Sequence, residues 1–121
     1  MKKSFVITAG VFGFIGVALG AFGGHALKEM ISPEMLEIYK IGVQYHLIHA
    51  VVLLAIALSG KEFLKQSFVF FAVGILLFSF SLYAYAISGL KFLVFITPLG
   101  GTSFLIGWGL VAYQSWKQVK E

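Results

Sequence analysis

The sequence contains no cysteine and few charged residues. The absence of cysteine excludes disulfide bonds, thiol catalysis and thiolate metal sites. Charged residues make up 12% of the 121 residues, whereas a soluble domain has about a quarter. Hydrophobic residues make up 60%, and the mean hydropathy is +0.96. Because so little polar surface cannot cover a water-soluble protein, the sequence predicts a protein embedded in a lipid bilayer.

The long apolar segments of the sequence lack aspartate and glutamate. All five acidic residues are glutamates in the connecting segments or the C-terminal tail. The chain therefore offers no paired carboxylates for acid–base catalysis and no serine–histidine–acid arrangement. The nine lysines form no cluster typical of nucleic-acid binding. These absences favour a non-enzymatic protein whose partner is the lipid bilayer and not a nucleic acid, although they do not decide the question of activity.

Four apolar segments are long enough to cross a bilayer, which takes about 17–25 residues. They span approximately residues 5–24, 43–59, 64–87 and 93–116. Together they predict a single four-span transmembrane domain over residues 1–121, folded as an all-α integral membrane four-helix bundle. A signal peptide is the alternative interpretation of the first segment, but this segment is too long and too rich in glycine for one.

A polar patch separates the first two predicted spans. Ser32 is a good N-cap, Pro33 suits a first helical turn, and Glu34 lies near the positive end of the helix dipole. Apolar residues then recur at roughly helical spacing. Residues 33–42 therefore predict a short amphipathic helix at the membrane interface, between spans 1 and 2. This helix either stops before the second span or runs straight into it.

The lysines are distributed unevenly between the two sides of the predicted bundle. The N-terminus, the second loop and the C-terminus share one side, which holds Lys2, Lys3, Lys61, Lys65, Lys117 and Lys120. The other side holds Lys28, Lys40 and Lys91. The positive-inside rule then predicts a multi-pass protein of the cell membrane with both termini in the cytoplasm.

Glycine is concentrated in the first and fourth spans, where it predicts close packing of helices. Gly20 and Gly23 belong to a glycine stripe on the first span. In the fourth span Pro98 lacks an N–H group, and Gly100 and Gly101 permit close approach or local unwinding of the backbone. The close neighbours are expected within the chain or across a homo-oligomer.

The histidines and several tyrosines are predicted to form a polar cluster in the outer leaflet. His25 ends the first span, while His46 and His49 lie near the start of the second span. His46 and His49 are three residues apart and Tyr45 and His49 four apart, so each pair shares a helix face. Tyr83 also falls in the outer half of its span. We expect His25, Tyr45 and His49 to lie near one another.

Three interpretations of this cluster remain open. The side chains form hydrogen bonds between helices, which stabilise a membrane bundle modestly. Alternatively, the histidines bind a metal ion or haem, since imidazole is the commonest metal ligand. The third interpretation is a proton or small-ligand site, because ionisable residues inside a membrane are often functional. The cofactor, if there is one, is not identified by the sequence.

Four motifs resemble a known family of small four-span membrane proteins. They are GAFGGH at residues 20–25, YHLIH at 45–49, FSFSLY at 78–83 and TPLGGTSFLIGW at 97–108. Together they resemble the "domain of unknown function 423" family, whose members are bacterial and animal membrane proteins. The resemblance covers nearly the whole chain and includes the closing Trp108.

The resemblance implies an architecture but no reaction, since the family has no established activity. His25 and His49 match histidines of the family pattern, whereas His46 stands where glutamine is usual. That departure opposes a three-histidine metal site. The leading hypothesis is a non-enzymatic membrane protein, either a scaffold or accessory subunit or a pathway for a small solute or ion. The alternative is a metal- or haem-binding redox protein that uses His25 and His49.

Overall fold

The computed structural model describes residues 2–120, among which four helical spans are long and apolar enough to cross a membrane. The helices are α1 (Lys3–His25), α2 (Pro33–Ser59), α3 (Lys65–Gly74), α4 (Phe80–Ser88) and α5 (Thr97–Gln118). A π-helical segment, Ile75–Ser79, joins α3 to α4, so these elements form one span. The prediction of an all-α fold with four long apolar helices is confirmed.

The predicted separate interfacial helix is wrong, since residues 33–42 are the first turns of α2 in the described chain. The predicted helix start is correct, because the Met35 N–H donates to Ser32 Oγ at 3.2 Å and Pro33 follows the cap. Breaking the helix further along would leave backbone groups unpaired in lipid. Gly42 lies inside this continuous helix, and the ring of Tyr83 occupies the space where its side chain would lie.

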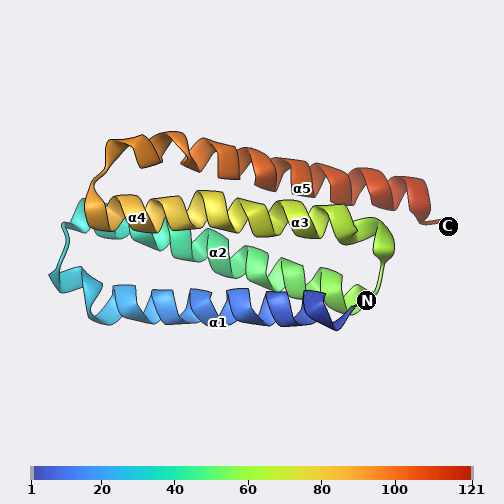
Figure 1. Cartoon of the computed structure of the whole chain (residues 1–121), viewed down its shortest axis with the longest axis horizontal. Helices are drawn as coiled ribbons and strands as arrows, with labels where there is room; N and C mark the ends of the chain where they lie inside the picture. Colours follow the sequence, from blue (N-terminus) through green and yellow to red (C-terminus); the bar gives the residue numbers. More distant parts are fainter. Residues whose placement is uncertain (1, 121) are drawn as a thin grey trace.

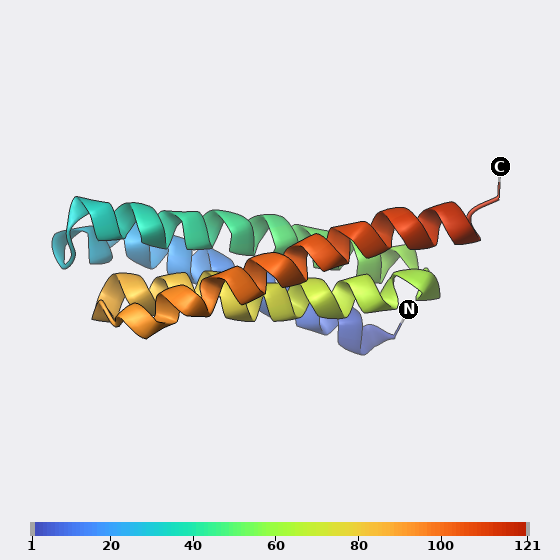
Figure 2. The same cartoon turned by 90° about the horizontal axis from the view of Figure 1, so that it is seen from above.

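The four spans are arranged with α1 and α5 on opposite sides of a central pair, formed by α2 and the α3–α4 span (Figure 1). α1 packs chiefly on α2, and α5 packs on α3 and the π-helical segment. The N- and C-terminal ends of the described chain lie at the same end of the bundle, as both views show (Figure 2).

The interior divides into two apolar clusters with polar residues between them. The larger cluster fills the half of the bundle near the chain ends and contains Ala9, Leu53, Ile56, Ala57, Phe68, Phe71, Ile75 and Phe104. The smaller cluster lies at the opposite end and contains Leu27, Tyr39, Tyr83 and Ala86. The polar side chains between them are the functional candidates.

The backbones of two helical segments approach each other closely at Gly100, near the start of α5. A Cβ atom there would collide with the backbone of Leu77 and Phe78 in the π-helical segment. Pro98 stands in the first turn of α5, where its missing N–H costs nothing. Gly100 thus lies against the backbone of the π-helical segment, whereas a Cβ at Gly101 would make an ordinary contact with Phe78, at 3.9 Å.

Gly20 and Gly23 of the first span also face α2. A Cβ at Gly20 would lie 3.2 Å from Val43, and one at Gly23 would collide with the ring of Tyr39. The Tyr39 hydroxyl donates a hydrogen bond to the carbonyl of Leu19. Small residues thus allow α1 and α2 to pack closely near the end of the bundle away from the chain termini.

Candidate functional site

His46 lies at the centre of α2, thirteen residues from Pro33 and thirteen from Ser59. His49 lies one turn further along the helix. The sequence predicts both histidines in the outer half of the second span, near its start, whereas the structure shows that helix α2 begins well before them. The difference arises because the helix begins at residue 33 and not at residue 43, so the ten residues assigned to an interfacial helix are its first turns.

His46 connects three helices through both of its ring nitrogens. Nε2 lies 2.8 Å from the carbonyl oxygen of Phe12 in α1, and Nδ1 lies 2.8 Å from the Tyr83 hydroxyl in α4. Since a carbonyl only accepts, Nε2 carries the hydrogen, and in the neutral ring Nδ1 accepts from Tyr83. The side chain is 0% exposed. Its hydrogen bonds therefore join α1, α2 and α4 in the interior.

His49 joins α2 to α5, and its ring hydrogen lies on the other nitrogen from that of His46. The indole N–H of Trp108 donates to Nε2 at 3.1 Å, so this nitrogen is the acceptor. Nδ1 therefore carries the hydrogen and donates to the carbonyl of Tyr45 at 2.8 Å. The ring also stacks on Phe104, with 3.8 Å between centroids. The two histidines are thus opposite tautomers in one helix.

The two buried histidines do not form a chelating pair. The ring of His46 points toward α1 and α4, whereas that of His49 points toward α5. All four ring nitrogens already have hydrogen-bond partners within the bundle. Across residues 2–120, no group of three or more His, Cys, Asp or Glu side chains could hold a metal ion.

His25 is separate from the other two histidines. It is the exposed last residue of α1, thirteen residues beyond Phe12, the α1 residue that His46 contacts. At 1.5 Å per residue, this distance along the helix is about 20 Å. The structure therefore does not bring His25 to Tyr45 and His49. The expectation that these three side chains lie near one another is wrong, because His46 and His49 lie deeper than predicted.

Buried hydroxyl groups add further contacts between helices. Ser81 Oγ and Thr97 Oγ1 lie 2.6 Å apart and join α4 to α5, and Ser103 donates to the carbonyl of Phe70 at 2.7 Å. The hydroxyls of Ser67 and Ser79 are buried without a hydrogen-bond partner in the described part of the chain. Most of the polar interior is thus used to hold helices together.

Two hydrogen-bond partners of the histidines could not be predicted from the residue pattern. The contact with the Phe12 carbonyl could not be predicted from the sequence, since every residue carries a backbone carbonyl and none is distinguished by its type. Trp108 was noticed only through the family resemblance, although it is the donor to His49. Because the residues around Trp108 are almost all apolar, the sequence does not indicate that its side chain is on the side of α5 that contacts His49 of α2.

Comparison with known proteins supports the resemblance. The family model "Protein of unknown function (DUF423)" matches residues 19–101. The UPF0382 membrane protein of Haemophilus influenzae is 42% identical over 120 residues, which cover 97% of either chain. The UPF0382 inner membrane protein YgdD of Escherichia coli K12 is 40% identical over 114 residues, covering 91% of this chain and 87% of YgdD.

A third similar protein comes from Bacillus subtilis 168. The UPF0382 membrane protein YwdK of Bacillus subtilis 168 is 38% identical over 114 residues, which cover 90% of this chain and 93% of YwdK. No solved structure shows a significant match. The matches extend over nearly the whole chain, and the chain belongs to the DUF423 (UPF0382) family of multi-pass membrane proteins, whose activity is unknown.

Proposed function

We propose that this chain is a non-enzymatic membrane protein that acts as a scaffold or accessory subunit, and that it assembles with a second copy of itself through α1. The observation that carries the proposal is an open apolar groove of about 470 Å³ along α1 and α2. It is lined by Ala9, Gly10, Gly13, Phe14, Val17, Leu47, Ala50, Val51 and Leu54.

The groove has the properties of a surface that receives a helix. A Cβ atom added at Gly10 or Gly13 would meet no atom within 4 Å, as is also true of Gly24 at the end of α1, whereas the glycines at 16, 20 and 23 face α2. Phe14 is 77% exposed and Val17 63% exposed beside them. Small residues that allow close backbone contact drive helix association in lipid, where apolar burial alone does not. This exposed half of α1 is therefore the surface offered to a partner.

The buried polar residues support a structural role and not a redox one. A metal or haem bound by His25 and His49 would require the two rings to converge, and they lie far apart along the bundle. Binding at His46 or His49 would also break hydrogen bonds that connect helices. The names of the relatives support a location in the cell membrane, and the lysine distribution alone supports the proposal that both termini lie in the cytoplasm.

Cross-linking of single-cysteine variants in native membranes tests the proposal, since the natural chain has no cysteine. Gly13→Cys is expected to give a disulfide-linked dimer under mild oxidation. Gly109→Cys on α5 is the matched control, because that glycine also has open space beside it. Equal yields for the two variants, or a monomer in both, would contradict assembly through α1.

A pathway for protons or small solutes is the second candidate, and one observation favours it. His46 is an ionisable residue buried at the centre of α2, and a proton added to its Nδ1 would reverse the hydrogen bond, so that Nδ1 donates to the Tyr83 hydroxyl. The apolar cluster between His46 and the chain ends opposes a continuous path through one copy. Proteoliposomes that collapse a pH gradient with the natural chain but not with His46→Gln would support this second function over the first.

A further inference from the structure

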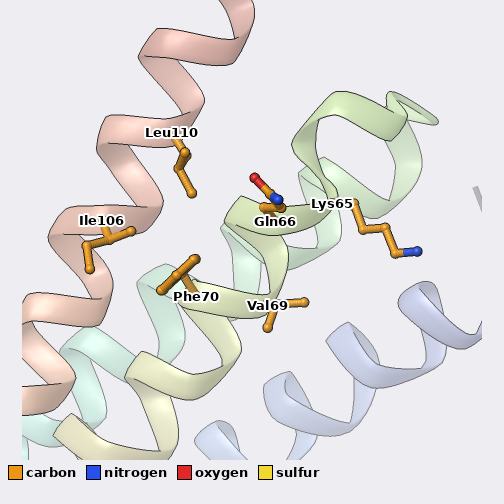
Figure 3. Close-up of a pocket in the computed structure, with 6 residues that line it drawn as sticks. All are labelled: Lys65, Gln66, Val69, Phe70, Ile106 and Leu110. Carbon is orange, nitrogen blue, oxygen red and sulfur yellow. The ribbon is translucent and has the colours of Figure 1, made fainter.

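A second groove lies on the other side of the bundle, between α3 and α5. It is lined by Lys65, Gln66, Val69, Phe70, Ile106 and Leu110 and has a volume of about 640 Å³ (Figure 3). This volume falls in the range of about 300–1,000 Å³ that is typical of small-molecule sites. Ile106 and Leu110 of α5 face Phe70 and Gln66 of α3 across it. The groove is open along its side, so an occupant would enter from the surrounding lipid.

The polar residues of this groove all lie at one end. Lys65 and Gln66 begin α3, at the end of the bundle that also holds the chain termini. Deeper into the span the lining is apolar. The Lys65 side chain leaves α3 on the side away from Ile106 and Leu110 (Figure 3), and its flexible four-carbon chain would have to turn back for the ammonium to reach a group seated above Gln66. A ligand that fits this lining has an anionic head and an apolar tail.

The charges of the whole molecule favour an anionic ligand at this end. Six lysines and one glutamate, Glu62, lie there among the described residues, and Glu121 lies outside them. The opposite end holds three lysines and three glutamates, including the ion pair of Lys40 with Glu37 at 3.7 Å. One end is thus strongly positive and the other balanced. Exposed Trp116 on α5 marks an interface with lipid headgroups at the positive end.

We infer that the α3–α5 groove binds an anionic phospholipid, with the headgroup at Lys65 and Gln66 and an acyl chain along Phe70, Ile106 and Leu110. This site is independent of the groove along α1 and α2. Lipid-exposed lysines at a membrane surface attract anionic headgroups, and apolar walls at membrane depth accept acyl chains. The α3–α5 groove combines both features on two helices that pack against each other.

Native mass spectrometry of the detergent-purified chain, titrated with phosphatidylglycerol or phosphatidylcholine, tests this inference. The natural chain is expected to retain phosphatidylglycerol more tightly. Lys65→Gln removes one positive charge and is expected to weaken phosphatidylglycerol binding about five-fold without changing phosphatidylcholine binding. Leu110→Trp fills the apolar part and is expected to weaken binding of both lipids. Thermal unfolding of each variant verifies that it is folded.

Two control variants distinguish the groove from general attraction to lipid. Lys91→Gln removes a lysine at the opposite end, and Leu105→Trp enlarges a side chain of α5 that is 74% exposed. Neither change should affect lipid retention. The inference is overturned if the two lipids bind equally, if Lys91→Gln weakens phosphatidylglycerol binding as much as Lys65→Gln, or if Leu110→Trp binds lipid like Leu105→Trp.

Discussion

Replacing Gly100 with alanine is expected to push α5 away from the π-helical segment Ile75–Ser79. The added Cβ would lie 2.6 Å from Phe78 Cα and 2.7 Å from the Leu77 carbonyl carbon, whereas ordinary contacts begin at 3.4 Å. These are backbone atoms, so no change of side-chain rotamer can relieve the collision. The helix must therefore move outward by about 1 Å to restore normal contacts.

The cost of this movement can be estimated from the contacts around Gly100. Overpacking a tightly packed interior costs about 1–3 kcal/mol. The shift also strains two hydrogen bonds to α5, from Ser103 to the Phe70 carbonyl and between Thr97 and Ser81. Such bonds contribute about 0.6 kcal/mol each in a membrane bundle. The Gly100→Ala variant should therefore be less stable by about 2–4 kcal/mol.

Reversible unfolding in mixed micelles, followed by circular dichroism during titration with a denaturing detergent, measures this difference. Gly109→Ala is the matched control, since it lies in the same helix and a Cβ there meets nothing within 4 Å. Alanine has a higher helix propensity than glycine, so the control should be neutral or more stable by up to about 1 kcal/mol. If Gly100→Ala is no less stable than Gly109→Ala, the close approach of α5 to the π-helical segment is refuted.

Three further predictions concern the histidines and use the same unfolding measurement. Tyr83→Phe removes the donor to His46 Nδ1 and should cost about 1–2 kcal/mol, because a buried acceptor is left unpaired; a neutral effect would contradict this hydrogen bond. Trp108→Phe should cost a similar amount by leaving Nε2 of His49 unpaired, and unchanged stability would argue against that contact. His25→Ala should change stability by less than about 0.5 kcal/mol, because the side chain is exposed, and a larger loss would place it in the interior.

The four spans could be predicted because hydropathy over a span-length segment reports directly on burial in lipid. The boundary between the first two spans could not be predicted as well. Pro33 and Ser32 mark the true start of α2, but Lys40 and Glu37 make its first turns resemble a separate interfacial helix. In a membrane these charged side chains lie at the interface while the backbone continues as one helix.

The sequence predicted which polar side chains are candidates for the site but not which groups they contact, and the reason is physical. Buried polar side chains in an apolar sequence are conspicuous, so His46, His49 and Tyr83 stood out. Their partners did not, since the direction in which each ring points depends on how the helices pack. The π-helical segment before Tyr83 shifts the register of α4 relative to α3 and has no evident signal in the sequence.

The same limit applies to His25. Its place at the end of the first span suggested a site shared with His49. That prediction assumed that α2 begins near residue 43, which would put His49 at about the same level of the bundle as His25. Once ten residues are added to the start of that helix, His46 and His49 move to the middle of the bundle and His25 stays at its end.

His46 and His49 are, in this structure, hydrogen-bonding residues that join helices of the bundle, and their partners predict neutral rings. Solid-state ¹⁵N NMR of histidine-labelled protein in bilayers at neutral pH tests this central claim most directly, with His46→Gln and His49→Gln assigning the signals. The expected result is two neutral rings of opposite tautomer, with the hydrogen on Nε2 of His46 and on Nδ1 of His49. Two rings of the same tautomer, a charged ring at His49, or signals shifted by a bound metal would contradict it.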